Sequence, residues 1–157
     1  MSVGLPERLV SGAIGAGVLT AINQAAQSMR RDAPRMDLVG MQATARGIAL
    51  AGGRVPDAQR LFCLTLVGDL VSNGIYYAAI PSRTSRATWT RAVAVGLSAG
   101  AGALLLSRYV IGNDSPHSDS PANNVMTVAW YLAGALAAAA AAHVMNKRRT
   151  PHSHNTA

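Results

Sequence analysis

Long apolar segments of this chain are separated by polar, charged segments. Four apolar stretches of about 20 residues or slightly more are separated by segments that hold most of the charges. Because a helix rises about 1.5 Å per residue, such a stretch crosses the roughly 30 Å hydrocarbon core of a bilayer. The pattern predicts an all-α integral membrane bundle of four transmembrane helices. We expect the spans at about 6–29, 61–80, 89–112 and 122–145.

A soluble four-helix bundle is the main alternative, and it would need a polar face on every helix. The third stretch, AVAVGLSAGAGALLL, has no charged residue between Arg91 and Arg108. Only 13% of all residues are charged, whereas 50% are hydrophobic. The mean hydropathy of +0.20 is low for a polytopic membrane protein because the spans are rich in the weakly apolar residues alanine and glycine. We therefore favour the membrane interpretation.

The first apolar stretch could instead be a cleaved signal peptide, because Arg8 precedes it and alanines follow it. However, Glu7 offsets the charge of Arg8, and Asn23 and Gln24 crowd the region where cleavage would occur. We expect a retained helix.

The longest connection covers residues 30–60, and part of it has a helical pattern. Apolar and small residues recur on one stripe from Met36 to Leu50, which predicts a short amphipathic helix over about 35–51. Such a helix would lie in the headgroup layer or across one end of the bundle. We expect a polar, flexible loop between the third and fourth spans. Residues 1–146 would form one transmembrane domain, followed by a flexible basic tail over 147–157.

Loop charges give only weak evidence on orientation. The 14 Lys and Arg residues divide equally, seven on the side of the termini and seven on the other side. The run KRR directly after the fourth span and the acid-free loop RTSRATWTR favour cytoplasmic termini. The equal division also permits insertion in both directions and an antiparallel dimer.

Small residues four positions apart allow membrane helices to approach closely. Gly96 and Gly100 form a GxxxG motif, and Ser98 with Gly102 gives a weaker version on the same helix. This spacing predicts a tight bundle or a dimer and does not distinguish between them.

The stretch GDLVSNGIYY (68–77) places an aspartate inside an otherwise apolar span. Asp69, Asn73 and Tyr76 share one helix face, and Asn23 and Gln24 form a similar polar stripe on the first span. Both stripes lie about 9 to 12 Å from the ends that meet the first loop. Because consecutive spans run antiparallel, we expect the two stripes to meet at one depth.

An aspartate in hydrocarbon costs several kcal/mol unless it is paired, hydrated or protonated. Arg108, at the end of the third span, is the first candidate for its partner. Asp69 would either tie the helices together or serve as a proton- or cation-sensitive group in a small cavity. The predicted buried polar cluster comprises Asn23, Gln24, Asp69, Asn73, Tyr76, Arg108 and Asn124.

Motifs for known chemistry are missing from the sequence. It contains no glycine-rich phosphate loop, nucleophile elbow or zinc motif, so we predict no catalytic residues, metal or cofactor. The net charge of +7 could indicate a nucleic-acid partner, but arginines beside the spans are better explained by anionic lipid headgroups. Cys63 is the only cysteine, so an intrachain disulfide is excluded.

The pairing of DAPRMDLVGMQA (32–43) with GDLVSNGIYY resembles a group of small, uncharacterised bacterial integral membrane proteins. The resemblance implies a multi-pass protein of the bacterial cytoplasmic membrane and supplies no activity.

Two classes of function are favoured by the sequence. One is a non-enzymatic scaffold or accessory subunit that acts with a membrane-protein partner or as a homo-oligomer. The other is a small proton- or cation-coupled transporter or channel that acts as an oligomer through Asp69. Membrane-embedded catalysis by Asp37, Asp69 and Arg108 is a weaker third class, because no spacing identifies it.

Overall fold

The chain folds into helices joined by short connections. The computed structural model describes residues 3–29, 33–111 and 120–149, and it has no strand in these ranges. The all-helical prediction is therefore confirmed for this part of the chain. In chain order, the helices are α1 (Leu5–Met29), α2 (Met36–Leu50), α3 (Ala58–Tyr77), α4 (Ser85–Leu105), the π-helix η1 (Leu106–Ile111) and α5 (Pro121–Arg149).

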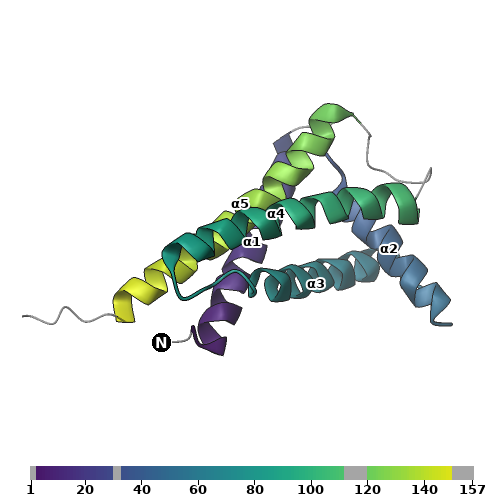
Figure 1. Ribbon diagram of the computed structural model, residues 1–157. Coiled ribbons are helices and arrows are strands. Elements are labelled where there is room, and N and C mark those ends of the chain that lie inside the picture. Colours follow the sequence, from purple (N-terminus) through teal and green to yellow (C-terminus); the bar gives the residue numbers. More distant parts are fainter. Residues whose placement is uncertain (1–2, 30–32, 112–119, 150–157) are drawn as a thin grey trace, which may run out of the picture.

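Four of the helices form a bundle, and α2 crosses one end of it (Figure 1). Helix α5 packs extensively against both α1 and α4, and α1 packs on its other side against α3. Helix α2 contacts α3 and η1, whereas α3 and α4 touch each other only weakly. The bundle is therefore a curved row in the order α3, α1, α5, α4, which is open between its first and last members.

Neighbouring helices of the bundle run antiparallel. The Arg8 guanidinium donates a hydrogen bond of 3.4 Å to the carbonyl of Ala78, which joins the start of α1 to the end of α3. Ser85 Oγ lies 3.3 Å from His143 Nδ1, which joins the start of α4 to the last turns of α5. The start of α1 and the end of α5 consequently lie at the same end of the molecule (Figure 1).

Three helices in the described ranges are long and apolar enough to cross a membrane. They are Leu5–Met29, Ser85–Tyr109 and Pro121–Arg148, and they support the prediction of a membrane protein. The remaining predicted span corresponds to α3, which is 20 residues long. It is not among these three helices, and it carries Asp69 and Asn73 in its second half.

The connector helix was predicted over 35–51, and α2 covers Met36–Leu50. Only the first half of its predicted apolar stripe is buried against the bundle. Val39 is fully buried in the first half, whereas Gly47 and Leu50 in the second half are exposed. One face of α2 therefore packs on the bundle over about its first two turns, and the rest of the helix extends past the start of α3 (Figure 1).

One boundary differs from the predictions. Residues 147–149, assigned to a flexible tail, continue α5, while 150–157 lie outside the described residues. The loop predicted between the third and fourth spans falls mostly on 112–119, which also lie outside the described residues, and α5 begins at Pro121. Ser120 caps this helix, because its Oγ accepts a hydrogen bond of 3.2 Å from the backbone N–H of Asn123.

Glycines allow the bundle helices to approach closely along the contacts of α5. A Cβ atom on Gly15 would lie 2.6 Å from the carbonyl oxygen of Gly134, so α1 and α5 touch through their backbones. On α4, a Cβ atom on Gly96 or Gly100 would lie 2.8 Å from a Cα atom of α5. The GxxxG motif therefore packs within the chain, and we call this close contact of α5 with α1 and α4 the seam.

Candidate functional site

Helix α3 presents opposite chemistry on its two sides. Leu64, Val67, Val71 and Ile75 are exposed on the outside of the bundle. Asp69 lies on the other side and is partly buried. In a water-soluble protein the charged face would be outside, so this inverted arrangement is typical of a helix that faces lipid.

Asp69 lines a small, partly enclosed space between α1, α2, α3 and α5, which we call the inner cavity. Its volume is about 30 Å³, enough for one or two water molecules. Asn23 and Gln24 from α1 lie on the wall of the same cavity, so the two polar stripes do meet at one depth. The lining residues are Leu19, Thr20, Asn23, Gln24, Met36, Asp37, Phe62, Thr65, Leu66, Asp69, Trp130 and Tyr131.

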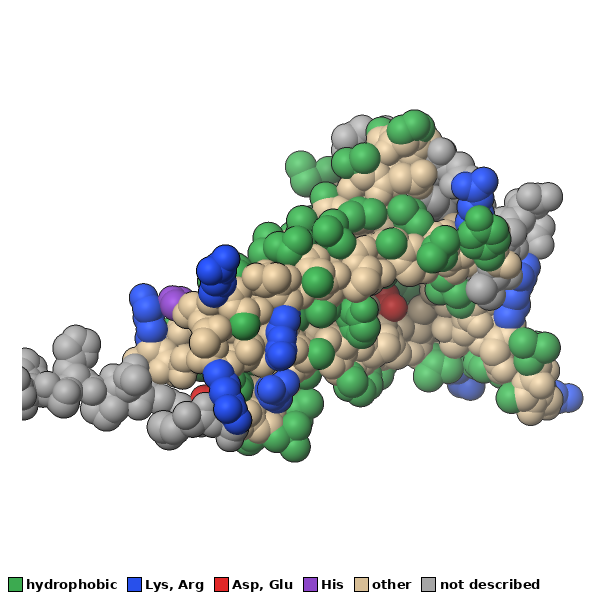
Figure 2. Space-filling view, in the orientation of Figure 1, with side chains coloured by type: hydrophobic (Ala, Val, Ile, Leu, Met, Phe, Trp, Pro, Cys, Tyr) green, Lys and Arg blue, Asp and Glu red, His purple; other side chains and the backbone are tan. Residues whose placement is uncertain are grey.

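Asp69 also lines a wider space of about 410 Å³ where α3 and α4 diverge, which we call the groove. Figure 2 shows an acidic side chain in the hollow between these two helices. Tyr76 Oη and Ser98 Oγ are 2.8 Å apart and bridge the two walls of the groove. The lining residues are Met36, Val39, Gly40, Asp69, Ser72, Asn73, Tyr76, Ser98, Ala99, Gly102, Ala103, Leu106 and Tyr131.

The boundary between the inner cavity and the groove is formed by three residues that line both spaces: Met36, Asp69 and Tyr131. Within the described part of the chain, the Asp69 carboxylate has no hydrogen bond or ion pair. One turn earlier, Thr65 is 8% exposed, and its Oγ1 also has no hydrogen-bond partner among the described residues. Two oxygen-bearing side chains thus face a partly enclosed space without a protein partner.

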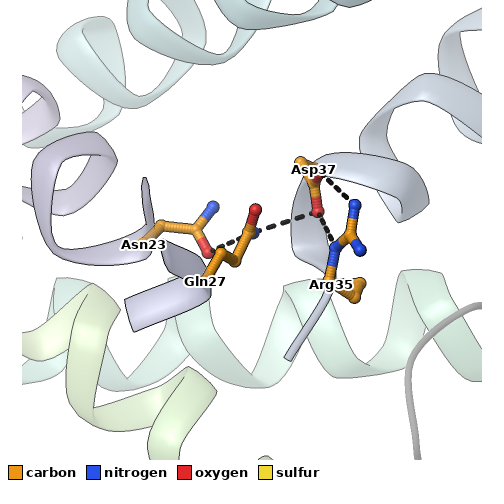
Figure 3. Close-up of polar contacts among 4 residues, drawn as sticks. All are labelled: Asn23, Gln27, Arg35 and Asp37. Atoms are coloured by element: carbon orange, nitrogen blue, oxygen red, sulfur yellow. Dashed lines mark hydrogen bonds and ion pairs between the residues drawn. The ribbon is translucent and has the colours of Figure 1, made fainter. Parts of the chain in front are cut away.

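The other carboxylate of the inner cavity, Asp37, is fully paired (Figure 3). Arg35 donates to both of its oxygens, with Nε to Oδ1 at 3.2 Å and Nη2 to Oδ2 at 3.1 Å. Gln27 Nε2 donates to Asp37 Oδ1 and to Asn23 Oδ1, both at 3.0 Å. This network joins the end of α1 to the start of α2, where the helix dipole also favours the charge of Asp37.

The structure places Arg108 and Asn124 apart from Asp69. Arg108 is exposed, lies over the Tyr109 ring at 5.9 Å and lines neither the inner cavity nor the groove. Asn124 is half-buried in the first turn of α5 and also lies outside both spaces. The π-helical turn explains the position of Arg108, because its i→i+5 pattern rotates the side chains relative to a continuing α-helix.

Tyr77 and Tyr131 are residues whose importance the sequence analysis missed. Tyr77 is completely buried, and its hydroxyl donates a hydrogen bond of 2.9 Å to the carbonyl of Tyr131. Tyr131 lines both spaces and separates the inner cavity from the groove. A signal was present, because Thr127 and Tyr131 follow Asn123 and Asn124 at helical spacing along an otherwise apolar span.

A smaller space of about 20 Å³ lies at the opposite end of the bundle, between the start of α1 and the end of α5. Glu7, Ser85 and His143 line it. The contact between Ser85 Oγ and His143 Nδ1 forms part of its wall.

Metal centres built from several acidic, histidine or cysteine side chains are absent from the described residues, since no group of three or more such residues comes together there. Comparison of the chain with models of protein families, with curated proteins and with solved structures gives no match.

Proposed function

We propose that this chain is a four-span protein of the bacterial cytoplasmic membrane, in which α3 crosses the bilayer together with α1, α4 and α5. Two observations support the fourth span. The outward side of α3 is an exposed apolar stripe. On the face in Figure 2, Lys and Arg side chains gather at the two ends of the molecule, and apolar side chains cover the surface between them.

Cysteine labelling tests the fourth span directly. In a Cys63→Ala background, single cysteines replace Val55, just before α3, and Ser85, just after it; both positions are exposed. If α3 spans the membrane with cytoplasmic termini, an impermeant thiol reagent labels Val55→Cys in intact cells and leaves Ser85→Cys unlabelled until the cells are lysed. Complete labelling of both positions in intact cells would place the ends of α3 on one side and leave three spans. Partial labelling of both that is completed only on lysis would indicate insertion in both directions.

We propose further that the protein acts as a non-enzymatic scaffold or accessory subunit, which binds a transmembrane helix of another membrane protein in the groove. The observation that carries this proposal is the groove itself. It opens between two helices whose outer faces are apolar, and it holds Asp69, Asn73 and Ser98 on its walls. Lipid tails cannot form hydrogen bonds with these groups, whereas a polar side chain on a neighbouring helix can.

The walls of the groove indicate the chemistry of the partner. On α4 the wall is built from small residues, Ser98, Ala99 and Gly102, which permit close approach of another helix. On α3 it presents the carboxylate of Asp69. Two copies that faced each other groove to groove would bring two such carboxylates together, which is unfavourable. We therefore expect a different protein, whose helix carries small residues and a hydrogen-bond donor.

Two matched glycine variants test this docking function. Gly102 lines the groove and Gly17 lies on α1 outside it, and a Cβ atom would meet nothing within 4 Å at either position. Gly102→Leu fills the groove and should abolish co-purification of a membrane-protein partner after mild detergent extraction. Gly17→Leu should retain that partner. Loss in both variants, retention in both, or recovery of only a second copy of this chain would contradict the proposal.

Proton- or cation-coupled transport is the second candidate, and one observation favours it. Asp69 stands at the boundary between a partly enclosed space and one that opens to the outside of the bundle, as a group that passes an ion would. Purified protein in liposomes should then carry a proton or cation flux that Asp69→Asn abolishes without loss of folded protein. Absence of flux from the parent would reject transport and leave the docking function untouched.

A further inference from the structure

The inner cavity presents oxygen atoms that lack partners. Thr65 is more than nine-tenths buried, and its Oγ1 accepts and donates no hydrogen bond within the described chain. Asp69 follows one helical turn later on the same face and lines the same cavity. Because a buried polar group without a partner is costly, the contents of the cavity are expected to satisfy both side chains.

The charges around the cavity do not balance. Of its two carboxylates, Asp37 is neutralised by the guanidinium of Arg35. Asp69 is not neutralised, since no Lys, Arg or His residue is among the described residues that line the cavity. The Asp69 carboxylate therefore has no counter-ion among the described residues that line the cavity.

We propose that the inner cavity binds a monovalent cation of the size of sodium, held by the Asp69 carboxylate and the Thr65 hydroxyl. A single uncompensated carboxylate neutralises one positive charge, whereas a divalent ion would leave one positive charge without a counter-ion. Hard cations prefer oxygen ligands, and Asn23 Oδ1, which accepts one hydrogen bond from Gln27, retains a lone pair on the wall of the same cavity for a third ligand. A volume of about 30 Å³ accommodates the ion and one water molecule.

The neighbouring side chains fix two of these ligands. Gln27 holds the Asn23 amide, and the Asp37 to Arg35 pair holds Gln27 in turn. On the opposite wall, a Cβ atom on Gly40 would lie 2.9 Å from Thr65 Cγ2, so α2 packs directly on the methyl group of this threonine. The site goes beyond the docking function, because a bound cation would stabilise the bundle whether or not a partner occupies the groove.

Thermal unfolding of the full chain in detergent tests the site. Sodium chloride is titrated against choline chloride at constant ionic strength and constant pH, so that screening and protonation do not change. We expect the Tm of the parent protein to rise with sodium and to saturate. Thr65→Val should need about tenfold more sodium for half of the effect, and Asp69→Asn should show no sodium response at all.

Ser72→Ala is the matched control, because Ser72 lies on α3 near Asp69 and lines the groove but not the inner cavity. It should keep the sodium response of the parent. An equal Tm in sodium and choline, or a full response in both Asp69→Asn and Thr65→Val, would overturn the proposal. Gly102→Leu separates the two proposals, since it should lose the partner while the sodium response remains.

Discussion

Both faces of α4 carry small residues four positions apart, but only one of the two faces is packed against a neighbouring helix. Gly96 and Gly100 pack into the seam, where α5 leaves no room for a side chain. Ser98 and Gly102 face the groove, where a Cβ atom on Gly102 would meet nothing within 4 Å. The comparison teaches that small-residue spacing permits close approach without requiring it, and that the neighbouring helix decides which pair is used.

Adjacent tyrosines on α3 repeat this contrast. Tyr77 points into the bundle and is completely buried, whereas Tyr76 is 44% exposed and reaches across the groove to Ser98. We infer that the seam provides most of the stability of the fold. The groove contributes little stability, and its polar groups are available for binding.

The largest effect on stability is expected from leucine at Gly100 on α4, compared with leucine at Gly102 on the same helix. Gly100→Leu forces a side chain against the backbone of Val128 on α5 and should cost about 3 kcal/mol or more of unfolding free energy. Gly102→Leu enters open space and should change it by less than about 0.5 kcal/mol. Unfolding of both variants in mixed micelles by added denaturing detergent gives the comparison. Equal losses would mean that the groove is as tightly packed as the seam.

The sequence predicted the chain as a set of long apolar helices, because apolar runs and helical rise determine which segments can span a bilayer. It did not predict the order of packing. The tight contact between Gly15 and Gly134 joins residues far apart in the chain, and no local pattern distinguishes it from other small pairs. The end of α5 was also placed too early, because the basic residues 147–149 resemble a tail although they continue the helix.

The next largest effect concerns the charge of Asp69. In choline without sodium, Asp69→Asn removes an unpaired, partly buried charge and should be more stable than the parent by about 1 to 3 kcal/mol. Saturating sodium should reduce or reverse this difference, because only the parent binds the ion. Unfolding free energies of both proteins in the two salts provide the measurement. A variant that is less stable in choline would mean that the carboxylate has a protein partner.

Sequence periodicity identified the centre of the candidate site but not its boundary. Asn23, Gln24 and Asp69 were predicted to meet because two stripes lie at equal depth on antiparallel helices, and they line one cavity. Arg108 was chosen as the partner of Asp69 because it lies at the end of the third span, but this end of the helix is a π-helical turn, and Arg108 lines neither space. Such a turn has no reliable signature in a single sequence.

A smaller effect is expected at Tyr77. Its hydroxyl donates to the Tyr131 carbonyl in the interior, and Phe at this position leaves the ring packing intact. Tyr77→Phe should therefore lower the unfolding free energy by about 1 kcal/mol, the usual contribution of one such hydrogen bond. The same unfolding assay measures it, with the parent in identical micelles as reference. An unchanged stability would mean that this buried hydrogen bond does not contribute to the stability of the fold.

The smallest effect on stability is expected at Tyr76, the neighbour of Tyr77. Tyr76→Phe removes the contact with Ser98, but Ser98 Oγ keeps its hydrogen bond of 3.1 Å to the Val95 carbonyl, so no buried group loses its only partner. The unfolding free energy should change by less than about 0.5 kcal/mol. Because the contact links the walls of the groove, the variant should instead alter how much partner is retained during purification. If Tyr76→Phe destabilises the protein as much as Tyr77→Phe and leaves partner retention unchanged, the groove is a structural contact like the seam, and the contrast between the two regions is wrong.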